Sequence, residues 1–205
     1  IDVPEPSDLS FGPDKKTLLT VSDHTNQVYE MDLQGNIIRV FDYTGKDLEG
    51  VTYNPNEKII AIAEEADRKI TFIDYDNGHM IDSHEIIVPY GSANKGLEGI
   101  SYNTNNRFYY IVNEMNPKLL ICWNPEFGII SEDELSFATD YSGVYVDAEN
   151  SILWFVSDQS KCLMKCDYKT NVLEEFHLDA LKYEGIVVDN NLIYLVNDAT
   201  AKLNI

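Results

Sequence analysis

The stretch Asp47-Leu48-Glu49-Gly50-Val51 decides the fold, because it recurs along the chain. Clear copies read Gly96-Leu97-Glu98-Gly99-Ile100 and Lys182-Tyr183-Glu184-Gly185-Ile186. A degenerate copy reads Asp140-Tyr141-Ser142-Gly143-Val144, and a weaker one reads Pro6-Ser7-Asp8-Leu9-Ser10. Aligned on the residue before the glycine, the copies are separated by 42, 49, 44 and 42 residues. A period in the forties with strand-like sequence between the copies is typical of a β-propeller.

Each repeat has the composition of four short strands separated by turns. In the second repeat we expect strands at residues 51–53, 59–62, 70–74 and 85–88, with Asn, Asp, Pro and Gly in the turns. The second strand of each repeat is a short continuous apolar run, which suits a strand packed between neighbouring sheets. We therefore expect an all-β fold in one domain spanning residues 1–205, a β-propeller with five blades of four antiparallel strands. Six blades are the alternative.

The last repeat is shorter than the others, since it ends at Ile205 inside its third strand. The segment Ile1-Asp2-Val3 is short for a full strand. We expect an incomplete last blade, with its closing strand either upstream of Ile1 or supplied in part by residues 1–3.

Composition restricts the class of protein and of partner. The chain has 205 residues, 44% hydrophobic residues and a net charge of −20. This charge argues against nucleic acid as a partner, because phosphate binding requires clustered Lys and Arg. No apolar run reaches the 18 residues of a membrane span. Because the chain begins at Ile1 and not at Met, we expect either an engineered fragment or a processed product, in which any signal peptide is no longer visible.

The three cysteines predict free thiols. Cys162 and Cys166 lie four residues apart on one predicted strand, which places their Cα atoms about 13 Å apart and prevents a disulfide between them. Their spacing, with Cys122 far away in sequence, matches no zinc motif.

An acidic residue follows the second strand of every repeat. These acids are Asp23, Glu65, Glu114, Asp158 and Asp198. In a blade, the start of the first strand and the end of the antiparallel second strand lie on the same face. We therefore expect these five side chains to meet those of Glu49, Glu98 and Glu184 at one mouth of the axial channel.

Eight carboxylates at one opening repel one another. They remain hydrated and spread apart, take up protons, or surround a hard cation. Ca²⁺ accepts six to eight oxygen ligands in flexible geometry, and it suits this set better than Mg²⁺, Zn²⁺ or Cu²⁺. We expect Glu49, Glu98, Glu184, Glu65 and Glu114 as calcium ligands, with Asp23, Asp158 and Asp198 as secondary candidates. The alternative for the acids after the second strands is that they only cap turns by accepting backbone N–H bonds.

Three sequence features carry a family resemblance, namely the repeated Glu-Gly steps, Asn94-Lys95 before the third copy, and Asn113-Glu114-Met115-Asn116-Pro117-Lys118. With these features, the sequence resembles the SdiA-regulated, YjiK-like family of bacterial propellers. The resemblance implies an exported or envelope-associated protein, periplasmic or lipid-anchored, in a largely uncharacterised family. It also implies calcium, and a phytase-like or esterase-like activity has been suggested for relatives. Glu49, Glu98, Glu184, Glu114 and Glu65 match acidic positions of the family. The final turn, Asn197-Asp198-Ala199-Thr200, departs from the family pattern.

Three functions follow from these observations. The first is a calcium-binding platform or sensor that takes a small-molecule or protein ligand at the channel mouth. The second is a calcium-dependent hydrolase of phosphate esters or lactones, in which the metal polarises the substrate oxygen. The third is a scaffold whose acids only cap turns. No nucleophile elbow, P-loop or metalloprotease motif is present, and His24 is a lone histidine beside Asp23, so the catalytic residues and the question of catalysis itself stay open.

Overall fold

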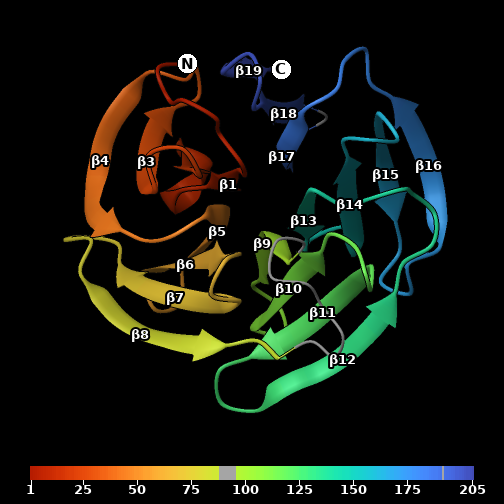
Figure 1. Cartoon of the computed structure of the whole chain (residues 1–205), viewed down its shortest axis with the longest axis horizontal. Helices are drawn as coiled ribbons and strands as arrows, with labels where there is room; N and C mark the ends of the chain where they lie inside the picture. The colour runs from red at the N-terminus through yellow and green to blue at the C-terminus, as the bar shows by residue number, and fades with distance from the viewer. Residues whose placement is uncertain (88–95, 191) are drawn as a thin grey trace.

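A computed structural model describes residues 1–87, 96–190 and 192–205 of the chain. Five antiparallel sheets are arranged around a common centre, each with its strands in sequence order (Figure 1). The five-bladed β-propeller is thereby confirmed, and the six-bladed alternative is wrong. The first strand of each blade lies nearest the centre, and the fourth strands of the first four blades lie on the rim.

The strands have the following bounds. The first blade contains β1 (Ser10–Phe11), β2 (Thr17–Ser22), β3 (Gln27–Asp32) and β4 (Ile37–Thr44), with a short 3-10 helix, η1 (Pro13–Lys15), after β1. The second contains β5 (Leu48–Asn54), β6 (Ile59–Glu64), β7 (Lys69–Asp74) and β8 (Met80–Glu85). The third contains β9 (Leu97–Asn103), β10 (Phe108–Asn113), β11 (Leu119–Asn124) and β12 (Gly128–Glu134). The fourth contains β13 (Gly143–Asp147), β14 (Ile152–Ser157), β15 (Cys162–Cys166) and β16 (Val172–His177). The fifth contains β17 (Tyr183–Asp189), β18 (Leu192–Asn197) and β19 (Lys202–Asn204).

The core lies between adjacent blades, which explains why the second strands are apolar on both faces. On β6, Ala61 faces a cluster shared with the third blade, whereas Ile60 and Ile62 face a cluster shared with the first. All three side chains are fully buried. Each buried isoleucine contributes about 1.5–3 kcal/mol to folding relative to an exposed one, so these strands hold the blades together.

One expected strand is misplaced, and the incomplete last blade is confirmed while one of the two alternatives for its closing strand is wrong. The fourth strand of the second blade is Met80–Glu85 and not residues 85–88, and Val88, like Asn94, Lys95 and Asn191, lies outside the described residues. Residues 1–3 form no strand, and the fifth sheet has three strands in the described part of the chain. The amino group of Ile1 instead donates a hydrogen bond to the carbonyl oxygen of Ala201 at 2.7 Å. The N-terminus therefore contacts the last blade without pairing with its sheet.

The inner strands approach one another so closely at the axis that glycine is required. A Cβ atom built on Gly50 would lie 2.4 Å from the carbonyl oxygen of Glu98, and one on Gly143 would lie 2.2 Å from that of Glu184. These neighbours are backbone atoms, which cannot move aside. The glycine of the repeated Glu-Gly step is therefore fixed by packing between blades.

Asp8 takes the place of glycine in the first blade and is fully buried. Its Oδ1 accepts a hydrogen bond from its neighbour's amide, Leu9 N, at 2.8 Å. Its Oδ2 accepts bonds from Val51 N at 2.9 Å and from Ile100 N at 3.3 Å. One carboxyl group thus ties together the inner strands of three blades.

The three cysteines are free and buried, as the sequence predicts. Burial raises the pKa of Cys162 to about 11 and that of Cys166 to about 12, so these thiols are poor nucleophiles at neutral pH.

Among the described residues, no helix reaches the length and hydropathy of a membrane span.

Candidate functional site

The Glu-Gly step forms a β-bulge in three blades. The register between the first and second strands shifts between Leu48 and Gly50, and again between Tyr183 and Gly185. In the third blade the pairing passes from Ile111–Ile100 to Asn113–Leu97, so the extra residue again lies on the first strand, β9. A bulge leaves one residue unpaired and re-aims its side chain. The glutamates at these steps, Glu49, Glu98 and Glu184, are therefore released from strand pairing at the start of their strands.

The acids after the second strands lie where the sequence places them. The strands β2, β6, β10, β14 and β18 each end at the residue before the acid. Two of the acids also bridge to the next blade: Glu65 Oε1 accepts a hydrogen bond from Gly96 N at 2.7 Å, and Asp158 Oδ1 accepts one from Lys182 N. One oxygen of each of these two residues thus accepts a backbone hydrogen bond from the next blade, and within the described residues the other oxygen accepts none.

All eight acids predicted from the sequence line one pocket of about 260 Å³. Ser7, Asp140, Ser142, Gln159 and Lys182 complete its lining. Neither histidine nor cysteine is among these lining residues, and its donors are almost all oxygen atoms. Such a donor set suits a hard cation.

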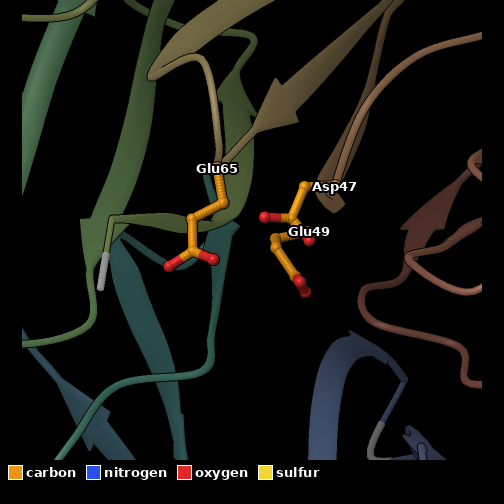
Figure 2. A group of neighbouring side chains, drawn as sticks. All are labelled: Asp47, Glu49 and Glu65. Carbon is orange, nitrogen blue, oxygen red and sulfur yellow. The ribbon is translucent and has the colours of Figure 1, made fainter. Parts of the chain in front are cut away.

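The carboxylates are closest together on one side of this pocket. Carboxylate oxygens of Asp47, Glu49 and Glu65 lie within 4.8 Å of one another, and so do those of Glu65, Glu98 and Glu114. Figure 2 shows the first trio gathered around one space, with Glu65 reaching from the end of β6 toward the start of β5. We call these five residues the Glu65 cluster. Glu65 belongs to both trios and is itself buried, with 8% of its surface exposed.

The opposite side of the pocket carries a lysine that the sequence analysis did not include. Lys182 Nζ lies 3.6 Å from Glu184 Oε1 and 3.6 Å from Asp198 Oδ2. Its charge offsets that of the carboxylates around it, and Glu184 joins neither trio. The carboxylates are therefore most closely grouped at the Glu65 cluster, where the charge of Arg68 also acts on Glu65.

Burial and mutual repulsion shift the protonation of the inner glutamates. Burial is the main cause that raises the pKa of Glu49 and of Glu98 well above the usual range, and neighbouring carboxylates raise both further. Burial also raises the pKa of Glu184 to about 8, although the charge of Lys182 acts in the opposite direction. Without a cation, these groups retain protons at a pH where ordinary glutamates are ionised.

We expect the metal-free protein to lose stability as the pH rises from about 5 to about 8. An unfolded glutamate ionises near pH 4.3, whereas folded Glu184 holds its proton to about pH 8. In that interval the folded state binds more protons than the unfolded state, so the free energy of unfolding falls with pH, by about 1 kcal/mol per unit for one such group. Thermal unfolding in chelator at several pH values measures this slope.

The variant Glu184→Gln has no carboxyl group to titrate and should show a shallower slope. A melting temperature that rises over the same interval in the unmodified protein would contradict the raised pKa values.

Sequence reasoning missed Asp47 of the Glu65 cluster and Asp140 of the pocket lining, although a signal for both existed. Asp47 lies two residues before Glu49, and Asp140 lies two residues before Ser142. Side chains two apart on a strand share a face, so this spacing could have placed both residues beside the repeated step. Lys182 occupies the same position in the last copy.

Asp23 contributes an incomplete hydrogen-bonding site. Its Oδ1 is buried and has no hydrogen-bond partner within the described part of the chain. Burial and the charge of Glu5 raise its pKa. His24 is exposed, and its Nδ1 lies 3.5 Å from Glu5 Oε2 and not in the pocket lining. An orphaned carboxylate oxygen is what a cation or an ordered water would satisfy.

Comparison with known families gives one match over nearly the whole chain. A family model described as SdiA-regulated matches residues 3–199.

Comparison with solved structures gives propellers of low sequence identity. A structure of streptogramin B lyase is 16% identical, with a TM-score of 0.62, and the match covers 100% of this chain and 69% of that one. A catalytically inactive virginiamycin B lyase from Staphylococcus aureus, with quinupristin, is 15% identical, with a TM-score of 0.62 and coverage of 99% and 67%. A β-propeller domain from Myceliophteria thermophila is 10% identical, with a TM-score of 0.57 and coverage of 96% and 63%. The chain thus spans about two thirds of the length of these proteins, and the likeness supports the fold alone.

Proposed function

This chain belongs to the SdiA-regulated family, and from that premise we propose that it is a calcium-binding β-propeller of the bacterial cell envelope. It would act as a binding or sensing platform for a small-molecule or protein ligand at the acidic pocket. The envelope location, periplasmic or lipid-anchored, rests on the resemblance to bacterial propellers of this family.

The observation that carries the proposal is the position of Glu65 in two carboxylate trios. Two blades contribute to them, since Asp47, Glu49 and Glu65 come from the second blade and Glu98 and Glu114 from the third; Asp23 of the first blade lies in the same pocket. Glu65, Glu49, Glu98 and Glu114 would hold Ca²⁺, and the orphaned Asp23 oxygen lies in the same lining. A bound divalent ion would offset the repulsion that otherwise keeps these groups protonated.

This arrangement also suggests how a ligand could be sensed. Glu65 bonds to the backbone of Gly96, so a cation held by Glu65 would be linked directly to the neighbouring blade. Ca²⁺ often keeps water or ligand oxygens in its coordination sphere. A carboxylate or phosphate group of a partner could complete it.

Calorimetric titration of chelator-treated protein with Ca²⁺ tests the proposal. We expect saturable binding and a rise in melting temperature, with Mg²⁺ binding more weakly because it requires a tighter octahedron. Glu65→Gln should weaken Ca²⁺ binding by about 10–100-fold, the range found when a metal site is disrupted. Glu132→Gln makes the same charge change on the exposed rim strand β12 and should bind as the unmodified protein does.

No heat of binding and no thermal shift at millimolar Ca²⁺ would reject the proposal. Equal losses in Glu65→Gln and Glu132→Gln would show that only the overall negative charge attracts the ion.

A calcium-dependent hydrolase of phosphate esters or lactones is the second candidate, and one observation favours it. The pKa of Glu184 is raised to about 8, which suits a general acid or base near neutral pH. Bound Ca²⁺ would supply polarisation of the substrate oxygen. Hydrolysis of aryl phosphates or lactones that requires Ca²⁺ and falls in Glu184→Gln would support this candidate over a platform.

A further inference from the structure

A second pocket, of about 340 Å³, lies at the other end of the inner strands. Tyr53 and Tyr102 line it, four residues beyond Glu49 and Glu98 on the same strands, which is about 13 Å further along the axis. The two pockets share no lining residue, and fully buried Asp8 lies between them. This volume is within the range of pockets for small organic ligands.

Hydrogen bonds between blades fix the walls of this second pocket. Tyr53 N donates to Ser10 Oγ at 3.1 Å, Tyr102 N donates to Thr52 Oγ1 at 3.0 Å, and Val146 N donates to Ser101 Oγ at 3.0 Å. The three hydroxyl groups are thereby engaged with the backbone of the next blade. A ligand would meet a rigid surface that is already formed before binding.

Four aromatic residues form part of that surface. Phe11, Tyr53, Tyr102 and Tyr145 come from four different blades and all line the pocket. Phe11 packs edge-on against Tyr145, with ring centroids 6.2 Å apart, and Tyr102 packs against Tyr109 at 5.0 Å. Within the described part of the chain, the hydroxyl groups of Tyr53 and Tyr145 form no hydrogen bond, so both can serve a ligand.

The charge at the rim of this pocket is negative. Lys15, the lining residue with a positive charge, forms an ion pair with Asp189 at 2.6 Å, and its Nζ lies 5.6 Å from the centroid of the Phe11 ring. Asp14 and Asp147 are engaged with Lys16 and Asn150. Glu149 has no ion pair or hydrogen bond from its carboxylate among the described residues. Aromatic faces and a free carboxylate together favour a cation over an anion.

We propose that this second pocket binds a small organic cation, an ammonium group carried on a flat apolar body. The apolar body would lie among Phe11, Tyr53, Tyr102 and Tyr145, where the tyrosine rings would also attract the positive charge, since Lys15 already lies over Phe11. The ammonium group would face Glu149, and the hydroxyl groups of Tyr53 and Tyr145 would accept its hydrogen bonds. This site is separate from the Glu65 cluster and requires no metal.

Titration of the intact protein with three probes of one shape tests this proposal. Phenethylamine is a cation, phenethyl alcohol is neutral and hydrocinnamate is an anion. We expect saturable binding of phenethylamine, followed by calorimetry or tyrosine fluorescence, with about tenfold weaker binding of the alcohol and none of the anion. Equal affinity for all three probes, or no binding of phenethylamine at millimolar concentration, would overturn the proposal.

Four variants test whether phenethylamine binds in this second pocket. Thr104→Trp changes an exposed turn residue of the lining and should fill the pocket, which would abolish binding of phenethylamine. Glu149→Gln should weaken it about fivefold, as expected for a partly solvated charge pair, and Tyr145→Phe should weaken it by a similar factor. Glu98→Gln, in the acidic pocket, should leave it unchanged. Binding that survives Thr104→Trp, or is lost in Glu98→Gln, would contradict the assigned location.

Discussion

Replacing Asp8 by alanine is expected to lower the free energy of unfolding by about 3–5 kcal/mol. The substitution removes the acceptor for the amides of Leu9, Val51 and Ile100. Asp8 is fully buried, so water cannot readily replace the lost oxygens. Each amide left unsatisfied costs about 1–3 kcal/mol, and together these losses approach the whole stability of many domains. Urea denaturation followed by circular dichroism measures the change.

Asp8→Asn is the matched control. It keeps the shape and one acceptor oxygen, the amide oxygen, which can still meet Val51 N and Ile100 N, so a smaller loss of stability is expected. Burial raises the pKa of Asp8 well above its usual range, so the uncharged asparagine is a close substitute for the protonated acid. A loss below about 1 kcal/mol in Asp8→Ala would show that the three amides find other partners.

Replacing Gly185 by alanine is expected to cost about 3 kcal/mol or more, or to prevent folding. The added Cβ would lie 2.4 Å from the carbonyl carbon of Asp8 and 2.4 Å from Leu9 N. Both are backbone atoms of the first blade, and Gly185 belongs to the last. The clash would therefore force apart the two blades that close the ring. Soluble yield and thermal unfolding both report this effect.

Gly128→Ala separates the clash from the general effect of removing a glycine. No atom lies within 4 Å of the position of its Cβ, although its φ of +76° disfavours alanine. A cost of about 1 kcal/mol is expected there. Equal destabilisation by the two substitutions would mean that the inner strands separate easily and that their close approach is not needed for folding.

The sequence predicts the number of blades because the inner strands pack against one another in a similar way from blade to blade. Four of the five have glycine where they meet a neighbouring strand, and in three of these the bulge before the glycine presents a glutamate to the acidic pocket. Both requirements fall on adjacent residues, so Glu49-Gly50 and its copies repeat together. Because the glycine is needed once in each of these four blades, it recurs along the chain at about the length of a blade, and this repeat can be recognised in a single sequence.

The role of Asp8 could not be predicted in the same way. Its partners Val51 and Ile100 lie 43 and 92 residues away, and nothing local distinguishes it from a degenerate copy of glycine. Burial at the axis exists only once all the inner strands are assembled. Asp8, which replaces the repeated glycine, therefore forms hydrogen bonds between blades that a glycine side chain could not form.

The rim strand of the second blade was misplaced for a different reason. Ile86 and Ile87 suggested a strand there, but Ile86 is buried after the end of β8, whereas Met80 and Ile81 are exposed within it, at 60% and 55% of their surface. A rim strand packs on one blade only, so its hydrophobic pattern constrains its position weakly.

The acidic pocket has one side with a lysine and one side where carboxylates are closest together, and this difference also depends on residues distant in sequence. All eight predicted acids line it, yet Lys182 pairs with Glu184 and Asp198, and the closest carboxylates are those around Glu65. Sequence symmetry predicts equal blades, and a single lysine breaks that symmetry.

Diffraction from crystals grown with Ca²⁺, measured at a long wavelength where calcium scatters anomalously, tests the central claim most directly. We predict one anomalous peak at the Glu65 cluster, with a Glu65 oxygen and a carboxylate oxygen of the third blade about 2.3–2.6 Å from the ion. A pocket without anomalous density at saturating Ca²⁺, or an ion bound only elsewhere on the surface, would contradict the proposal that carboxylates from separate blades converge to hold a cation.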